Sequence, residues 1–132
     1  MIAIDSSAIV AIALVEPEAQ LFSEIIASRR CMIGWPTVLE CRMVLSGIRE
    51  EAGLDVLDKL LGMPRLQTVA FDAVLYKAAA DAFDRFGKGR GHPARLNFGD
   101  CMSYAVAKTK GVPLLYKGTD FAATDLAAAL LP

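Results

Sequence analysis

The sequence predicts an α/β fold in which helices cover both faces of a short parallel β-sheet. Short apolar segments of strand length alternate with longer segments that carry apolar residues at helical spacing. This alternation is typical of parallel sheets, because the connection between two parallel strands is usually a helix. A chain of 132 residues has the length of one domain, residues 1–132, and can bury its own core.

The first half of the chain contains two expected strands and four expected helices. Arg29 and Arg30 stand at the end of one helix, where cations interact favourably with the helix dipole. A serine is expected to cap the first helix, and Gly53 is expected to end the long one. The expected elements are strands at 1–4 and 31–35 and helices at 6–14, 17–30, 36–53 and 54–63.

The second half continues the alternation. Asp72 is expected to cap a helix that Gly87 closes, and a glycine-rich loop then leads to an apolar helix that begins near Asn97. The pattern of the final segment, 125–132, fits a helix and a strand equally well. The expected elements are strands at 66–71 and 112–117 and helices at 72–87 and 97–111.

The composition limits the classes of function that need to be considered. Apolar residues make up 55% of the chain before its ten glycines are counted, whereas about 45–50% with glycine included is usual. We therefore expect an apolar surface that a partner or a second copy of the chain covers. The formal net charge of −1 means that any attraction to nucleic acid must be local.

Cysteine and histidine usage argues against several kinds of site. Three cysteines without a C-x-x-C pair make a disulfide framework or a zinc site unexpected, and they fit a reducing cytoplasm. His92 is the only histidine, which excludes a multi-histidine zinc site. We expect neither a signal peptide nor a membrane span, because Asp5 interrupts the N-terminal apolar run and no run approaches about 20 apolar residues.

Four carboxylates fall where strands end or helices begin. Asp5 directly follows the first strand, and Glu40 lies in the first turn of the helix after the second strand. Asp100 opens the helix that leads to the last strand, and Asp120 follows that strand. Because ligands of open parallel sheets bind at the carboxyl ends of the strands, we expect these four side chains to meet at one edge.

Each of these acids also has a purely structural interpretation. Asp5 fits a helix cap, Thr37-x-x-Glu40 fits a capping box, and Asn97-x-x-Asp100 fits a similar arrangement. Together, however, four carboxylates in apolar surroundings would repel one another and raise one another's pKa values. A divalent cation would remove that repulsion, and an all-oxygen ligand set suits Mg²⁺ or Mn²⁺.

A basic segment precedes the helix of Asp100. It runs from residue 85 to 95, contains three glycines and carries no acid. Beside an acidic metal site it would bind a phosphate backbone, although an ordinary solvated loop has the same composition. The expected phosphate-binding residues are Arg85, Lys88, Arg90 and Arg95.

The motifs together resemble the PIN-domain family, and most closely its VapC-type toxins from bacterial toxin–antitoxin pairs. The resemblance is carried by "MIAIDSSAIVAI", "TVLECRMVL", "GHPARLNFGDCMSYAVAK" and "LLYKGTDFAATDL", in this order. It implies a three-layer α/β/α sandwich and a ribonuclease that depends on Mg²⁺ or Mn²⁺ and is inhibited by a VapB-type antitoxin. The acidic site implied by the resemblance consists of Asp5, Glu40, Asp100 and Asp120.

The resemblance also suggests residues around that site. Ser6 and Thr119 are hydroxyl residues beside acids, Asn97 would order the turn of Asp100, and Asp125 is a nearby fifth acid that supports the metal or caps the last segment. VapC-type toxins pair with themselves and offer an apolar groove to an antitoxin helix. We place that groove at Trp35, Leu54, Leu57 and Leu60.

Three other interpretations stay open at this point. An enzyme that forms an aspartyl-phosphate at Asp5 would usually need a second acid two residues later, where this chain has Ser7. A receiver domain would need a phospho-accepting aspartate after the middle strand, and Asp72 there fits a helix cap. The third is a catalytically silent PIN-like module that binds RNA or a partner.

Overall fold

The structure is a computed structural model that describes residues 1–47 and 52–129. Within these residues the strands form a four-stranded parallel sheet in the order β3-β2-β1-β4. The chain fills the sheet from β1 outward to β3 and then returns to add β4 on the other side of β1. The strands are β1 (Ile2–Ile4), β2 (Cys31–Gly34), β3 (Leu66–Val69) and β4 (Leu114–Leu115).

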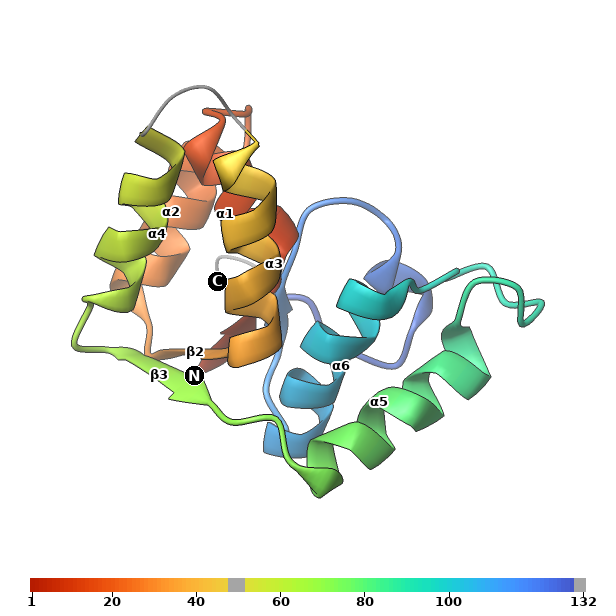
Figure 1. The fold of residues 1–132 in the computed structure, drawn as a ribbon. Coiled ribbons are helices and arrows are strands. Elements are labelled where there is room, and N and C mark those ends of the chain that lie inside the picture. The colour runs from red at the N-terminus through yellow and green to blue at the C-terminus, as the bar shows by residue number, and fades with distance from the viewer. Residues whose placement is uncertain (48–51, 130–132) are drawn as a thin grey trace.

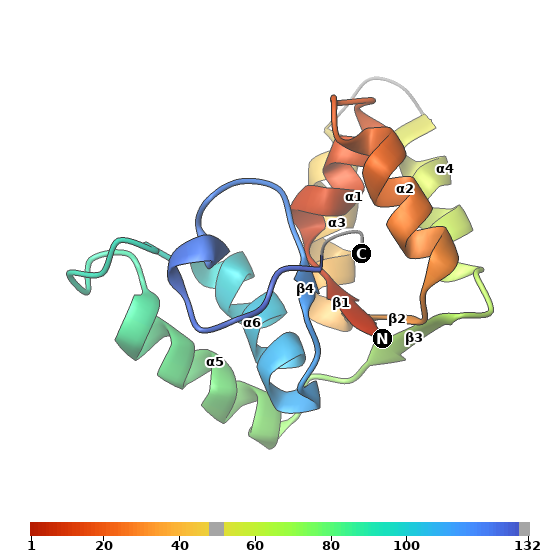
Figure 2. The ribbon, with the colours of Figure 1, turned by 180° about the vertical axis from the view of Figure 1, so that it is seen from behind.

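Helices cover both faces of this sheet, as Figures 1 and 2 show from opposite sides. One group packs on one face, and a pair of helices packs on the other, together with a 3₁₀ turn late in the described part of the chain. The first group is α1 (Ser6–Ala13), α2 (Ala19–Ser28), α3 (Trp35–Ser46) and α4 (Ala52–Leu61). The pair is α5 (Ala73–Phe86) and α6 (Phe98–Lys110), and the 3₁₀ turn is η1 (Phe121–Ala123).

The alternation of side chains along the strands explains the two layers of helices. Ile2 and Ile4 of β1 are buried in the core with α1 to α4, whereas Ala3 between them is buried in the core with α5 and α6. Successive strand residues point to opposite faces, so an entirely apolar strand needs cover on both. The expected three-layer α/β/α sandwich is therefore confirmed.

The boundary between α3 and α4 differs from the expected one. The long helix expected to Gly53 ends at Ser46, and Gly53 lies buried inside α4; residues 48–51 are outside the described part of the chain. A Cβ at Gly53 would lie 3.4 Å from Leu45 Cδ2, an ordinary contact distance, so this glycine lies where α4 packs on α3. A glycine that packs two helices together has the same sequence signal as one that ends a helix.

The last strand is shorter than expected, and the final segment runs alongside it. The N–H of Leu114 donates to the carbonyl of Ala127 at 2.9 Å, and the N–H of Ala129 donates to the carbonyl of Leu114 at 2.8 Å. A bridge between Leu114 and Ala128 gives the segment an extended conformation. The described part of the final segment is therefore extended and not helical.

Candidate active site

Asp5 is the most enclosed of the four acids. It follows β1 directly, its side chain is 3% exposed, and its N–H donates to the carbonyl of Leu115 in β4 at 2.9 Å. This position lies where the chain order of the sheet reverses, between β1 and β4, which is the usual ligand site of open parallel sheets. Asp5 also caps α1, so the expected serine cap is wrong.

The two carboxylate oxygens of Asp5 have different surroundings. Oδ2 accepts hydrogen bonds from the N–H of Ser7 at 3.0 Å and from the hydroxyl of Ser7 at 2.6 Å. Oδ1 is buried and has no hydrogen-bond partner among the described residues. A buried carboxylate oxygen without a partner is costly unless a cation or another ligand binds it. This oxygen is therefore available to a ligand.

Ser7 is a site residue that sequence reasoning missed. Its hydroxyl donates to Asp5 Oδ2 and accepts the N–H of Lys117 at 2.9 Å, so it joins the ends of β1 and β4. Ser6 was the expected hydroxyl, but its side chain makes no hydrogen bond within residues 1–47 and 52–129. The available signal was the position two residues after an N-cap aspartate, where a serine commonly bonds the cap.

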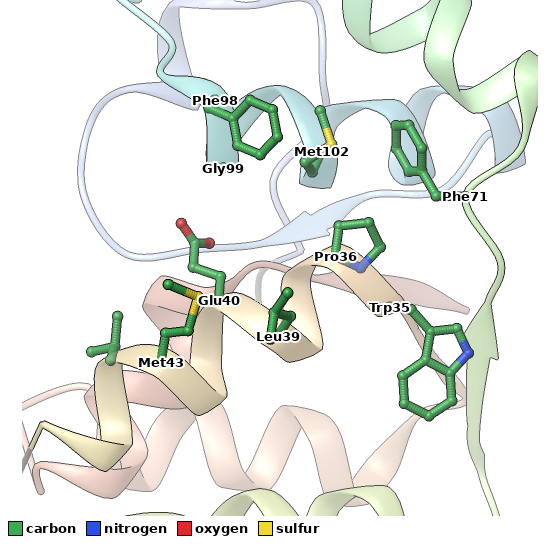
Figure 3. Close-up of a pocket in the computed structure, with 10 residues that line it drawn as sticks. Trp35, Pro36, Leu39, Glu40, Met43, Phe71, Phe98, Gly99 and Met102 are labelled. Atoms are coloured by element: carbon green, nitrogen blue, oxygen red, sulfur yellow. The ribbon is translucent and has the colours of Figure 1, made fainter.

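Glu40 reaches across from α3 to the start of α6. Its carboxylate lies against Gly99, as Figure 3 shows, and its side chain is half-buried. The expected capping box with Thr37 is wrong, because Gly34 is the N-cap of α3 and no side chain caps it. Thr37 is instead buried, and its hydroxyl lies 3.2 Å from the hydroxyl of Ser103 in α6.

Asp100 combines a structural and an electrostatic role. The N–H of Asp100 donates to Asn97 Oδ1 at 2.9 Å, and the N–H of Asn97 donates to Asp100 Oδ2 at 3.0 Å, so the capping box is real. The pKa of Asp100 is raised to about 6, chiefly by burial and also by the charges of Asp5, Asp120 and Glu40, against the lowering effect of the Asn97 N–H. Asp100 therefore lies within electrostatic reach of all three other acids.

Asp120 lies near the other acids, on the solvent-exposed side of the same edge. It is exposed and precedes η1 without capping it through its side chain. Thr119 beside it is also exposed, and its carbonyl accepts the N–H of Ala122 at 3.2 Å. The hydroxyl of Thr119 makes no contact with the acids among the hydrogen bonds of the described residues.

The donor set at this edge fits a divalent cation in its chemistry. It consists of carboxylate oxygens, and Asp5 Oδ1 among them is buried without a partner. In the part of the chain that the structure describes, no three Asp, Glu, His or Cys side chains stand close enough to hold an ion as they are. Glu40 is half-buried and Asp120 is exposed, so both can be reached from solvent, whereas Asp100 is held in place by its capping box.

Asp125, the fifth acid, is engaged elsewhere. It accepts hydrogen bonds from the hydroxyl of Tyr104 and from Lys108 Nζ, both at 2.7 Å, and pairs with Arg85 at 3.6 Å. Burial acts to raise the pKa of Asp125, but the hydrogen bonds from Lys108 and Tyr104 outweigh it and lower the pKa. These contacts fasten the final segment to α5 and α6.

The basic segment is partly neutralised by acids of α5. Arg85 belongs to that helix and pairs with Asp81 at 3.3 Å, and Arg90 pairs with Asp84 at 3.7 Å. Lys88 and Arg95 are exposed, and neither makes an ion pair within the described ranges. The prediction of four phosphate-binding cations therefore stays a prediction, and acids of α5 compete for two of the four.

His92 orders the loop of the basic segment. Its Nδ1 accepts the N–H of Ala94 at 3.0 Å, and its ring packs edge-on against Phe86 with centroids 4.9 Å apart. These contacts explain the position of His92, the only histidine of the chain, and no metal is needed to explain it.

An apolar pocket of about 680 Å³ adjoins the acidic edge (Figure 3). Glu40 and Gly99 belong to its lining, so the pocket and the acids share a wall. Exposed apolar side chains form much of the remainder, including Phe98, which is 79% exposed. The lining residues are Trp35, Pro36, Leu39, Glu40, Met43, Val44, Phe71, Phe98, Gly99 and Met102.

The residues expected to form the antitoxin groove do not line one groove in the described part of the chain. Trp35 lines the pocket beside the acids, but Leu57 and Leu60 are only 3% and 6% exposed in the core, and Leu54 packs against that core. Leu60 instead borders a separate pocket of about 330 Å³ between α1, α2 and α4. The spacing of the leucines marks the face of α4 that is buried in the core. A helix face that binds a partner would show the same spacing.

Comparison with known proteins identifies close relatives over nearly the whole chain. A family model described as the PIN domain matches residues 2–126. Ribonuclease VapC of Mycolicibacterium smegmatis is 44% identical over 126 residues, which cover 95% of this chain and 97% of that protein. Ribonuclease VapC30 of Mycobacterium tuberculosis is 41% identical over 130 residues, or 98% of each chain.

Solved structures share the fold at lower sequence identity. Mycobacterium tuberculosis VapC20, a toxin that cleaves the sarcin-ricin loop, superposes with a TM-score of 0.77 at 19% identity, covering 99% of this chain and 100% of that one. VapBC2 from Rickettsia felis, bound to a DNA fragment from its promoter, gives a TM-score of 0.75 at 16% identity and covers 97% of each chain. The chain therefore belongs to the PIN-domain family, and its relatives within that family are VapC ribonucleases.

Proposed function

We propose that this chain is a VapC-type ribonuclease toxin whose acidic edge hydrolyses phosphodiester bonds of RNA with the help of Mg²⁺ or Mn²⁺. The observation that carries the proposal is the buried oxygen Asp5 Oδ1, which has no partner among the described residues and lies at the ligand-binding edge of the sheet. A catalytically silent module is not favoured, because the relatives at 41–44% identity are named ribonucleases.

The proposed roles of the residues follow from their positions. Asp5, Glu40, Asp100 and Asp120 would hold the cation. A bound divalent cation supplies Lewis acidity, which activates water and offsets the charge of a phosphodiester group. Ser7 fixes the rotation of the Asp5 carboxylate so that Oδ1 faces away from the Ser7 hydroxyl.

Asp100 is held in a fixed place by its own helix. The capping box with Asn97 fixes its Oδ2, and a pKa near 6 leaves the carboxylate largely ionised at pH 7 and above. An ionised carboxylate is the form that binds a cation, so this environment suits activity near neutral pH.

Lys88 and Arg95 are the proposed main contacts to the RNA backbone, with Arg85 and Arg90 contributing where the phosphate displaces their present partners. An RNA substrate and a reducing environment for the cysteines place the activity in the cytoplasm under this proposal.

The partners we propose are a VapB-type antitoxin and a second copy of the chain. Two adjoining pockets share Phe71, Phe98 and Met102 and extend over α3, α5 and α6, where large apolar side chains are exposed. We propose that the second copy covers this face. The antitoxin would then use the pocket between α1, α2 and α4, which Leu60 borders. Within the described residues, no helix combines the length and the apolar character needed to cross a bilayer.

The test of the proposed function is cleavage of a panel of structured and single-stranded RNAs by the purified chain. We expect endonucleolytic products with Mg²⁺ or Mn²⁺, loss of cleavage with a chelator, and recovery when the ion is restored. Binding of the same RNAs without any cleavage under all metal conditions would support the silent module instead.

A further inference from the structure

The first turn of α6 contains a glycine whose presence the backbone does not explain. Gly99 lies between Phe98 and Asp100, inside a helix that runs without interruption to Lys110. Its φ is not in the left-handed region, so an alanine would adopt the same conformation. Glycine is less favourable than alanine inside a helix. The reason for a glycine at position 99 must therefore lie in the side chains around it.

The surroundings of Gly99 are the carboxylate of Glu40. A Cβ at position 99 would lie 2.7 Å from Glu40 Cδ and 2.8 Å from Oε1, with Oε2 closer still. Glu40 supplies all three of the nearest heavy atoms. The carboxylate thus occupies the space that any other side chain at position 99 would fill, and Figure 3 shows Glu40 extending from α3 toward this turn.

The two helices pack against each other next to this point. Thr37 lies three residues before Glu40 on α3, and Ser103 lies four residues after Gly99 on α6, so each pair shares one helix face. The hydroxyls of Thr37 and Ser103 are buried and lie 3.2 Å apart. A side chain at position 99 would therefore displace the flexible end of Glu40 and leave the helix packing in place.

The place that Glu40 occupies is suited to a carboxylate. It lies at the N-terminal end of a 13-residue helix, where the helix dipole favours negative charge. It is also next to Asp100, the third residue of the same helix. Glu40 and Asp100 come from helices on opposite sides of the sheet, and the Glu40 carboxylate lies in the space that a Cβ at the residue before Asp100 would fill.

We propose that Gly99 is a positioning residue, whose missing Cβ lets the Glu40 carboxylate lie against the first turn of α6, beside Asp100 and within reach of a shared cation. This role rests on the proposed function. Gly99 itself would not touch the substrate or the ion.

The test compares Gly99→Ala with Gly53→Ala. Both changes add one methyl group to a glycine inside a helix, but at Gly53 the neighbour is Leu45 Cδ2 at 3.4 Å and no acid is close. We expect Gly99→Ala to fold with a thermal midpoint at or above that of the wild-type chain. Its affinity for Mn²⁺, measured by calorimetry, should fall about 10- to 100-fold, as for residues that orient metal ligands. Gly53→Ala should bind Mn²⁺ like the wild-type chain.

A double-mutant cycle shows whether the effect acts through Glu40. In a Glu40→Ala background, Gly99→Ala has no carboxylate to displace, so it should change neither Mn²⁺ affinity nor RNA cleavage any further. Equal losses in both backgrounds would overturn the proposal, as would wild-type affinity in Gly99→Ala or a folding defect that Glu40→Ala does not relieve. A wild-type chain that neither binds Mn²⁺ nor cuts RNA would overturn the proposed function, and the role of Gly99 with it.

Discussion

At the scale of single residues, the hydroxyl of Ser7 decides how the Asp5 carboxylate is presented. It donates to one carboxylate oxygen at 2.6 Å and leaves the other oxygen without a partner among the described residues. The same hydroxyl accepts the N–H of Lys117, so one small side chain connects Asp5 to the segment after β4. A mispositioned Asp5 would weaken every step that depends on the cation.

We therefore predict that Ser7→Ala lowers Mn²⁺ affinity about 10- to 100-fold, because an oriented ligand loses its support. The free energy of unfolding should fall by about 1–2 kcal/mol, because the Lys117 N–H loses its acceptor. Calorimetric titration and chemical denaturation measure the two effects. Ser7→Thr keeps the hydroxyl and should recover most of the affinity, and Ser6→Ala should change neither quantity. An unchanged Mn²⁺ affinity in Ser7→Ala would contradict this role.

Ionisation of Asp100 makes the folding stability of the metal-free chain depend on pH, and the raised pKa sets the direction. Its pKa is raised from 3.8 to about 6, so the folded state binds a proton more tightly than the unfolded state does. The stabilisation by the protonated form is complete below about pH 4 and is lost as the pH rises through about 6. We predict that the metal-free chain is more stable at pH 5 than at pH 7.5, by on the order of 1 kcal/mol after allowance for solvent screening.

The variant Asp100→Asn provides the control for that prediction. Asparagine keeps an acceptor for the Asn97 N–H and removes the charge, so most of the difference between the two pH values should disappear. Thermal unfolding in the presence of a chelator measures it. If the wild-type chain were more stable at pH 7.5 than at pH 5, the carboxylates would not be crowded as described.

At the scale of elements, the sequence located the strands and helices well because their patterns are local. Buried strands read as short apolar runs, and Asp72 caps α5 through the N–H of Leu75 as expected. The errors came from residues whose partners are distant in sequence. Thr37 and Glu40 fit a capping box by spacing, but both bind or face α6, and only the packing of α3 on α6 decides that.

The candidate site shows the same division between local and distant information. The four acids could be proposed because strand ends and helix starts are visible in the sequence, and Asp100 lies within electrostatic reach of the other three. Ser7 and Gly99 were missed because neither residue type signals a function by itself. Leu57 and Leu60 were misplaced because a helical stripe of leucines looks the same whether a core or a partner covers it.

The four cations of the basic segment should contribute unequally to RNA binding. Lys88 and Arg95 lack ion pairs within the described residues, whereas Arg85 and Arg90 pair with acids of α5. Replacing Lys88 and Arg95 together by alanine should reduce the salt dependence of single-stranded RNA binding by about 0.7 per lost phosphate contact. Replacing Arg85 and Arg90 should have a smaller effect. Equal changes in slope for the two double variants would show that the pairing with α5 does not matter.

At the scale of the whole molecule, the apolar surplus of the sequence appears as an exposed face. Trp35 is 50% exposed, Leu39 59% and Tyr76 64%, and they lie on the side formed by α3, α5 and α6. A face of this kind usually binds another protein surface. Because Glu40 and Gly99 line the pocket on the same face, a second copy there would also enclose the acidic edge.

We predict that the wild-type chain is a dimer in solution and that Val44→Lys with Tyr76→Lys makes it monomeric. Both side chains are exposed, so lysine should not disturb the core, but two buried charges would oppose association. Analytical ultracentrifugation measures the mass of each form. Val15→Lys, on the exposed turn after α1, is the matched control and should remain dimeric. A dimeric double variant would place the interface elsewhere.

We propose that the edge built around Asp5 is a cation site for RNA hydrolysis. The most direct measurement is Mn²⁺ titration of the wild-type chain and Asp5→Asn, followed by RNA cleavage under the same conditions. We predict that Asp5→Asn folds with equal or higher thermal stability without metal, because a buried charge is removed, and that it loses Mn²⁺ binding and cleavage by orders of magnitude. A clearly less stable Asp5→Asn that still binds Mn²⁺ and cuts RNA would show that Asp5 is only a helix cap.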